Sequence, residues 1–417
     1  MTDETCLAEG LVVPTDFEIT GLNLNELVVG PTGSGKSFSN AYSRLLHTTE
    51  SSVVVPIAKR ELKDKFTKLF LERGYRVLDL NFAKPEESNV GYDPLNFINS
   101  EQDVIQLAQN LIGDPPKNTD PYWNNSSTSA LAAEIALVML NAKESGRRAS
   151  LADVMLLQKS FRFIEDGRST ITNLDALFER AERRYPNNQA SELWRTVRGL
   201  PRNTMSCVFS TFNTALDKVF SENIIEMSKK ENQVSIRDLG DQKTILFITT
   251  SPMNKTFQNF VNIMYADLFR ELFERSQECE NARLTVPVHI ICDDFACGSR
   301  IKDFEDYISI FRAAGISVTL LLQSESQLSS MYGEQAATTI INNCDTYVYM
   351  GGMDQKTCES VARRMNKPRH WVCALPRENV VVFRRSQKPY IAKRYQTLED
   401  PIYQQMMKDA DLKTKDK

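Results

Sequence analysis

The stretch GPTGSGKS, residues 30–37, has the composition and spacing of a phosphate-binding loop. It fits the pattern G-x-x-x-x-G-K-[ST] at every fixed place, with an apolar run before it and the segment FSNAYSRLL after it. Glycines let the backbone turn several N–H groups toward an anion, and a following helix adds the positive end of its dipole. We therefore predict a nucleotide site for ATP and Mg²⁺, with Lys36 on the β- and γ-phosphates and Ser37 on the metal. The predicted loop residues are Gly30, Pro31, Thr32, Gly33, Ser34, Gly35, Lys36 and Ser37.

A phosphate-binding loop needs an acidic partner at the end of a neighbouring strand, because the metal and the attacking water must be held opposite the phosphates. The segment VPVHIICDDFA, residues 286–296, supplies one. We predict that Asp293 holds the Mg²⁺ shell and that Asp294 acts as the base or water-orienting carboxylate. The alternative is an ordinary Asp-Asp turn, since turns favour aspartate. The run ISVTLLLQ (316–323) ends in Gln323, which would sense the γ-phosphate or orient water, or would be a surface glutamine.

These side chains need a scaffold, and short runs rich in Val, Ile and Leu near both ends of the chain provide one. Continuous apolar runs are typical of strands buried on both faces. Because they alternate with helical patterns, they predict an α/β fold with a mostly parallel sheet flanked by helices. The runs are NELVVG (25–30), SSVVVP (51–56), YRVLDL (75–80), TILFIT (244–249), VHIICDD (288–294), ISVTLLLQ (316–323) and TYVYMGG (346–352).

Between about residues 97 and 220 the pattern changes to amphipathic stretches such as EQDVIQLAQNLI and SSTSALAAEIALVMLNA, without β-branched runs. A chain of 417 residues exceeds the usual size of a single core, so a second domain or a large insertion is expected. We predict a nucleotide-binding domain whose first part is 1–96 and whose second part is 221–405. An all-α insertion would occupy 97–220, and 406–417 would form a charged, frayed tail.

Composition excludes several classes of protein. The chain is 41% hydrophobic and 25% charged, as in a soluble globular protein. Its longest apolar run, at 130–140, is too short to span a bilayer and contains Glu134, and the acidic N-terminus shows no signal peptide. A cytoplasmic protein is therefore predicted. The eight cysteines form no C-x-x-C pair and the three histidines are far apart, which argues against a dedicated zinc site.

The formal net charge of −4 gives no global signal for nucleic-acid binding, so any such contact must use local patches or a channel made by assembly. Basic residues with aromatic neighbours occur in ERAERRYP (179–186) and LWRTVRGLPRN (193–203). They form either a DNA- or substrate-facing surface or, because acidic residues are interleaved, a solvated charged face.

Taken together, these motifs resemble the type IV secretion coupling proteins, the conjugative ATPases of the TraG/TraD kind within the FtsK/HerA-like class. The resemblance extends from about Leu27 to about Pro401. Beyond the loop and the Asp-Asp strand, it is carried by GYRVLDLNF with NVGYDPLNFI (74–98), DPYWNNSSTSAL (120–131), INNCDTYVYMGGMDQKTCESVARRMNKP (341–368) and YIAKRYQTLEDPIY (390–403). It implies a P-loop NTPase of the RecA-like kind with an all-α insertion.

The resemblance also implies the partners and one further residue. Members of the family thread DNA through a hexamer, so single-stranded DNA, a relaxase cargo and secretion-channel components are the expected partners. A homo-hexamer is expected during activity and a monomer in isolation. Arg312, in FRAAGIS, matches the arginine that such hexamers present to the neighbouring subunit's nucleotide, and its alternative is a solvated residue at a helix end.

Two departures from the family qualify these expectations. The family generally has Asp-Glu where this chain has Asp293-Asp294, which shortens the second side chain by one methylene and predicts slower hydrolysis. The family's N-terminal membrane helices are missing, so a soluble variant or a separate membrane anchor at the inner face of the cell membrane is expected. Two other functions stay open: a docking receptor that binds ATP with little turnover, and a P-loop kinase acting on a small acceptor.

Overall fold

The computed structural model of the chain describes residues 3–57, 60–113, 120–164, 171–217, 221–249, 255–293, 295 and 300–415. The chain divides into two compact units. Unit 1 comprises Met1–Asn81, Ser235–Pro252 and Leu268–Lys417, and unit 2 comprises Phe82–Val234 and Met253–Asp267. Each unit is described by itself below.

Unit 1 is built on a nine-stranded sheet of order β11-β10-β9-β3-β8-β7-β4-β6-β5, beside a small β1-β2 hairpin. The seven strands predicted from apolar runs are all present, and each pairs in parallel with its neighbours among them. The sequence did not suggest β10 and β11, which add an antiparallel edge beside β9. The strands are β1 (Glu4–Ala8), β2 (Leu11–Pro14), β3 (Glu26–Val29), β4 (Ser52–Pro56), β5 (Arg76–Asn81), β6 (Thr244–Thr249), β7 (Val288–Cys292), β8 (Ile316–Leu322), β9 (Thr346–Tyr349), β10 (Asn379–Arg384) and β11 (Tyr390–Lys393).

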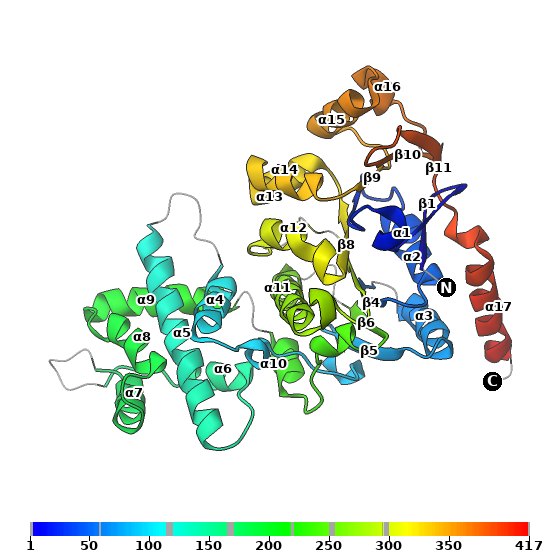
Figure 1. Cartoon of the computed structure of the whole chain (residues 1–417). Coiled ribbons are helices and arrows are strands. Elements are labelled where there is room, and N and C mark those ends of the chain that lie inside the picture. The colour runs from blue at the N-terminus through cyan, green and yellow to red at the C-terminus, as the bar shows by residue number, and fades with distance from the viewer. Residues whose placement is uncertain are drawn as a thin grey trace. The chain divides into compact units, whose positions relative to one another are not determined.

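Helices cover both faces of this sheet, with α2, α3 and α17 on one side and α12 and α13 on the other (Figure 1). Alternate strand residues such as Val28, Val53 and Leu321 pack into one core with the first group of helices. Their neighbours along the strands, such as Leu27 and Leu320, are equally buried. The unbroken apolar runs are therefore explained by burial on both faces. The helices of unit 1 are α1 (Phe17–Thr20), α2 (Tyr42–His47), α3 (Arg60–Glu72), α12 (Phe304–Ala314), α13 (Glu325–Tyr332), α14 (Glu334–Asn342), α15 (Gln355–Met365), α16 (Arg369–Cys373) and α17 (Pro401–Lys415), and α11 (Lys255–Glu278) belongs to both units.

Unit 2 is helical and contains the whole of the predicted insertion, 97–220, together with flanking residues on both sides. Several of its helices begin where serine or threonine closes a capping box with an aspartate three residues on, as Ser100, Ser150 and Thr172 do. Its helices are α4 (Glu101–Ile112), α5 (Pro121–Glu144), α6 (Leu151–Lys159), α7 (Asn173–Arg184), α8 (Gln189–Arg198), α9 (Arg202–Asp217) and α10 (Glu222–Lys229). In unit 1, α17 extends through Lys415, into the predicted tail 406–417.

A buried carboxylate holds the 3-10 turn that precedes the α-helices of unit 2. Asp93, in the YDPLNF segment, is fully buried and accepts hydrogen bonds from the backbone N–H groups of Leu95, at 3.0 Å, and Leu151, at 2.8 Å. It thereby ties the 3-10 turn Pro94–Phe97 to the start of α6. Burial raises the pKa of Asp93 to about 6, although the two N–H groups and Arg148, at 3.9 Å, favour the charged form.

This raised pKa predicts a pH-dependent stability. Between about pH 4 and pH 6 the folded chain keeps a proton on Asp93 that the unfolded chain has lost. The free energy of unfolding contributed by this group therefore falls as the pH rises through that window, by up to roughly 3 kcal/mol. In urea unfolding at several pH values, Asp93→Asn should remove this component, whereas Asp120→Asn, at an exposed helix cap, should retain it. Parallel pH profiles for Asp93→Asn and the parent protein would contradict the assignment.

Candidate nucleotide-binding site

The predicted phosphate-binding loop leaves the carboxyl end of β3 and is fixed there by both neighbouring strands. The Gly30 N–H donates to Leu322 O of β8 at 3.1 Å, and the Met350 N–H donates to Val29 O at 2.8 Å. A Cβ on Gly30 would lie 2.9 Å from the Cβ of Met350, so no larger residue fits. Gly35 has φ +87°, a left-handed conformation that favours glycine. The motif's glycines are therefore required by close packing and by backbone shape.

The lysine and the serine of the loop both form hydrogen bonds at this edge of the sheet. The Lys36 ammonium is buried and donates to the carbonyl oxygens of Gly30, at 2.8 Å, and Pro31, at 3.2 Å. The Ser37 hydroxyl donates to Asp293 Oδ2 at 2.6 Å. Asp293 follows β7, and β8 lies between β7 and β3 in the sheet. The fold therefore brings together two residues that are 256 positions apart in the sequence.

The helix after the loop begins with a π-helical turn, Ser37–Ala41, before α2. π-helical turns inside helices frequently occur at functional sites. Burial and then the negative charge of Asp293 raise the pKa of Tyr42, the first residue of α2, to about 12. A strand, a glycine-rich loop and a helix thus follow one another as the motif requires.

The remaining predicted residues on this edge of the sheet can be placed in part. Gln323 follows β8, between the loop and Asp293 in strand order, and its side chain is exposed. Its backbone N–H donates to Gln327 Oε1 at 3.3 Å. Asp294, the predicted catalytic carboxylate, lies outside the described residues.

The residues of the loop fit a phosphate group and a magnesium ion. Ser34 Oγ is buried and has no hydrogen-bond partner among the residues that the structure describes, so the loop contains an unsatisfied polar atom. A serine hydroxyl and a carboxylate, as in Ser37 and Asp293, are hard oxygen ligands of the kind that Mg²⁺ prefers. Lys36 would hold phosphate oxygens, and Ser37 with Asp293 would hold the ion.

Two arginines near the C-terminus hold the loop from outside, and sequence reasoning assigned them no role. Arg394 Nη1 donates to Ser34 O at 2.8 Å, and Arg377 Nη2 donates to Gly33 O at 3.2 Å. Their partners are 360 and 344 positions away in the sequence. Arg394 belongs to the YIAKRYQTLEDPIY segment, which the sequence marked only as a motif of the family. No local pattern connects either arginine with the loop.

The same C-terminal segment is also attached to the helix behind the loop. The Thr397 hydroxyl donates to Phe38 O at 2.6 Å, and Asp400 Oδ2 lies 2.9 Å from His47 Nε2. Tyr395 donates a further hydrogen bond to Asp400. The residues from Arg394 to Asp400 therefore form a brace, which we define as 394–400, along the loop and α2.

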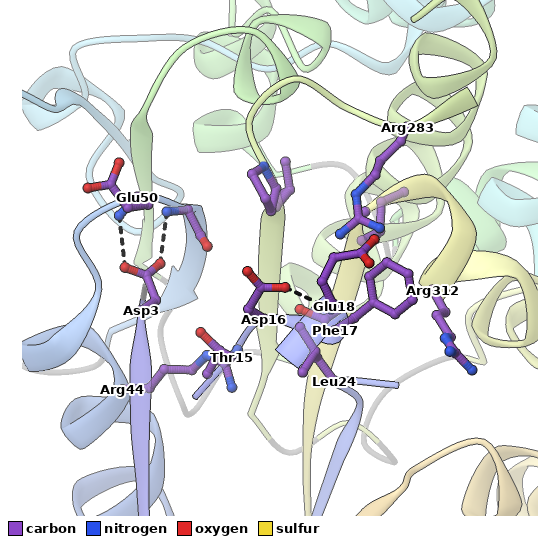
Figure 2. A pocket seen from close by; sticks show the side chains of 16 residues that line it. Asp3, Thr15, Asp16, Phe17, Glu18, Leu24, Arg44, Glu50, Arg283 and Arg312 are labelled. Carbon is purple, nitrogen blue, oxygen red and sulfur yellow. Dashed lines mark hydrogen bonds between the residues drawn. The ribbon is translucent and has the colours of Figure 1, made fainter. Parts of the chain in front are cut away.

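Arg312 does not meet the loop of its own chain. It lies in the last turn of α12, next to the amino end of β8, whereas the loop lies at the carboxyl ends of the strands. The seven residues of β8 separate the two edges by about 20 Å. Arg312 instead lines a pocket of about 330 Å³, beside Phe17 and Arg283 (Figure 2). Within one chain, the structure brings together Lys36, Ser37 and Asp293 but not Arg312.

Two arginines of the basic run 193–203 in unit 2 form ion pairs with nearby acidic residues. Arg195 pairs with Glu182 and Arg198 with Glu179, both at 2.7 Å. Trp194 is buried, and its indole N–H donates to Asp175 at 2.8 Å. The tryptophan is thus a core residue, and acidic neighbours balance much of the positive charge of this face.

The family of the chain follows from a comparison with known families. The family model described as type IV secretory system, conjugative DNA transfer, matches residues 14–367. The chain belongs to this family. The family that the sequence motifs indicated is therefore confirmed.

The individual relatives of the chain are distant. It is 21% identical to protein VirD4 of Agrobacterium fabrum over 354 residues, covering 80% of this chain and 48% of VirD4. It is 22% identical to conjugal transfer protein TraG of Escherichia coli over 355 residues, covering 76% of this chain and 51% of TraG. The chain thus spans about half the length of the curated relatives it matches. Within its described residues, no helix is both long and apolar enough to cross a membrane.

Solved structures share the fold. The bacterial conjugative coupling protein TrwBΔN70, in complex with sulphate, matches with a TM-score of 0.65 and 17% identity, over 91% of this chain and 88% of that one. TrwB in complex with the ATP analogue ADPNP matches with a TM-score of 0.63 and 18% identity, over 91% of this chain and 87% of that one. VirB4 of Thermoanaerobacter pseudethanolicus matches with a TM-score of 0.53 and 14% identity, over 97% of this chain and 98% of that one. The predicted P-loop NTPase fold is confirmed by these matches.

The loop lysine generates the first prediction of this site. Lys36→Ala removes a charge-assisted donor to the phosphates, so the affinity for ATP·Mg²⁺ should fall about tenfold or more. Calorimetric titration with a non-hydrolysable ATP analogue measures this, with exposed Lys388→Ala as the control that keeps its affinity. Circular dichroism should be unchanged, because the substitution leaves the backbone hydrogen bonds of the helices and strands in place. Unchanged ATP affinity in Lys36→Ala would exclude this loop as the nucleotide site.

The brace generates the second prediction. Arg394→Ala should weaken nucleotide binding less than Lys36→Ala does, because Arg394 positions the loop backbone without touching the phosphates. Hydrogen exchange of the amides in 33–41 should become faster, since a fixed carbonyl of the loop is released. Arg394→Lys should recover part of the protection through a single donor. If exchange in 33–41 and ATP affinity both match the parent protein, the brace has no role in positioning the loop.

Proposed function

We propose that the chain is the ATP-driven motor part of a coupling protein for conjugative DNA transfer. ATP hydrolysis in a homo-hexameric ring moves single-stranded DNA, or a relaxase–DNA cargo, toward a type IV secretion channel. The observation that carries this proposal is the 2.6 Å hydrogen bond between Ser37 and Asp293, which assembles the metal-binding half of a P-loop site in a member of this family. Proteins with the same fold were solved with ADPNP and with ADP and Mg²⁺, which supports ATP and Mg²⁺ as the ligands.

Each predicted site residue has a role in this proposal. Lys36 binds the β- and γ-phosphates, and Ser37 with Asp293 holds Mg²⁺, which neutralises the charge that develops on the phosphates. Asp294 orients the attacking water, and Gln323 senses the γ-phosphate from the end of β8. Arg312 acts on the nucleotide of a neighbouring copy, since its place at the amino edge of the sheet separates it from its own loop.

Assembly supplies the DNA site. Because the arginines of the basic run in unit 2 are paired with acidic residues, a few inward-facing lysines and arginines per subunit, repeated around a ring, would carry the contact with DNA. Cargo and channel components are the remaining partners, and the ring would act at the inner face of the membrane.

The proposal predicts cooperative, DNA-stimulated turnover. An arginine delivered from a neighbouring subunit is worth about 10³ or more in rate, so the isolated monomer should be nearly inactive. The hydrolysis rate should rise more steeply than protein concentration, and single-stranded DNA should lower the threshold. Mixing inactive Lys36→Ala with inactive Arg312→Ala should restore part of the activity, because some interfaces combine an intact loop with an intact arginine.

Three results separate the proposal from its alternatives. ATP binding without turnover at any concentration, with or without DNA, would favour the docking receptor. Phosphate transfer to a small acceptor that ignores DNA would favour the kinase. A rate strictly proportional to concentration, together with failure of the mixture in preparations that light scattering shows to contain mixed oligomers, would exclude action of Arg312 between subunits.

A further inference from the structure

Two arginines share one aromatic ring at the amino edge of the sheet in unit 1. The guanidinium carbon of Arg283 lies 4.5 Å from the centroid of the Phe17 ring, and that of Arg312 lies 5.0 Å from it. In Figure 2, Phe17 lies between the two arginines, which come from different elements: Arg283 from the segment before β7 and Arg312 from α12. The two cations are therefore at most about 10 Å apart.

The ring itself is held in place by a short capped helix. Phe17 begins α1, where Asp16 accepts a hydrogen bond from the Glu18 N–H at 2.8 Å and Gly21 closes the turn with φ +66°. The side chain of Arg283 also packs against Gly315. A Cβ placed on this glycine would lie only 3.2 Å from Arg283 Cγ. The paired arrangement thus follows from the fold and not from a chance rotamer of one side chain.

Within the part of the chain that the structure describes, neither arginine uses its side-chain donors in a hydrogen bond or an ion pair. Among the described residues, no carboxylate lies within 4.0 Å of Arg283 or Arg312, and no side chain or carbonyl accepts from them. Stacking uses the flat face of a guanidinium and leaves its in-plane N–H groups available, which is the arrangement that binds a phosphate through two parallel hydrogen bonds. Two neighbouring cations with available donors form a site for a compact, multiply charged anion.

The acidic residues around the pocket favour a compact anion over a nucleic-acid backbone. Asp3, in the wall of the pocket, accepts three backbone hydrogen bonds, from Thr49, Glu50 and Ser51. Asp16, Glu18 and Glu50 line the same pocket. A DNA strand needs a continuous basic track, and these carboxylates would repel it.

We propose that Arg283 and Arg312, stacked on Phe17, together bind the triphosphate held by the phosphate-binding loop of a second copy of this chain. Arg283 is then a second arginine of the composite site, and Phe17 is a positioning residue for both. The inference rests on the proposed function, in which copies join head to tail so that the amino edge of one sheet faces the loop edge of the next. Glu18, an exposed carboxylate beside the ring, opposes the incoming phosphate charge and limits the affinity.

The first test measures assembly and turnover separately. Sedimentation of the full chain with ATPγS·Mg²⁺ reports the composite site without hydrolysis. Arg283→Ala and Phe17→Leu should each reduce assembly, and should lower turnover about 10²-fold, the usual cost of one donor to developing charge. The affinity of the monomer for ATPγS should stay at the parent value, because its own loop is intact. Arg385→Ala serves as the control, since this exposed arginine pairs with Asp345, at the amino end of β9.

Conservative variants test whether a loss of assembly or turnover is caused by misfolding. Arg283→Lys keeps the charge but loses the two parallel donors, so turnover should recover only in part. Phe17→Tyr keeps the ring and should behave as the parent protein does. Glu18→Gln should promote assembly at lower ATPγS concentration, because a repelling charge has been removed. These three variants should give a graded series that loss of folding would not produce.

The outcomes distinguish this inference from the proposed function. Turnover of Arg283→Ala equal to that of Arg385→Ala, while Arg312→Ala is inactive, would overturn the paired site and leave the proposed motor intact. A parent protein that never hydrolyses ATP would exclude the motor, and loss of ATPγS-dependent assembly in Arg283→Ala would then still support the paired site. No ATPγS-dependent assembly of the parent protein would overturn it. The paired site would also be overturned if Arg283→Ala bound single-stranded DNA more weakly while its ATPγS-dependent assembly was unchanged.

Discussion

The hydrogen bond from the Ser37 hydroxyl to Asp293 Oδ2, 2.6 Å long, is the contact on which the rest of the site depends. It exists because β3, β8 and β7 lie side by side and parallel, so that whatever follows each strand emerges at one edge of the sheet. The loop after β3 supplies backbone donors and an ammonium, and the end of β7 supplies a carboxylate. A hydroxyl and a carboxylate already in contact form a pair that a hard cation can join with little rearrangement.

The loop is supported from two directions. From the sheet, Gly30 is held between β8 and Met350 at a distance that excludes any side chain. From outside, Arg394 and Arg377 bind carbonyl oxygens of the loop, and the brace 394–400 continues along α2. Charge-assisted hydrogen bonds are stronger than neutral ones, so two guanidinium groups restrict a glycine-rich backbone that would otherwise be mobile. The C-terminal part of the chain thereby becomes part of the nucleotide site.

A buried polar chain lies under the amino half of the same strands. Arg44 of α2 pairs with Glu26 of β3 at 2.7 Å, and Glu26 also accepts from Thr319 at 3.1 Å. Thr319 lies 2.9 Å from Nε2 of His289, whose Nδ1 lies 2.7 Å from the Ser317 hydroxyl. Burial, and then the charge of Arg44, keep the pKa of His289 well below its usual value, so the imidazole is neutral. Every member of the chain has a partner, which is the condition under which such a network can be buried.

The sequence by itself determined the parts of this protein that local rules govern. The loop pattern required a strand before it and a helix after it, and unbroken apolar runs identified seven strands because both faces of a parallel sheet are buried. Only the tertiary structure decided which distant groups meet. The antiparallel strands β10 and β11, the arginines 377 and 394 on the loop, and the stacking of Arg283 and Arg312 on Phe17 join residues that no short-range pattern relates. The periodicity of apolar residues shows which face of a strand is buried, whereas packing of the whole chain sets the order of the strands in the sheet. That order brings Ser37 to Asp293 and separates Arg312 from both.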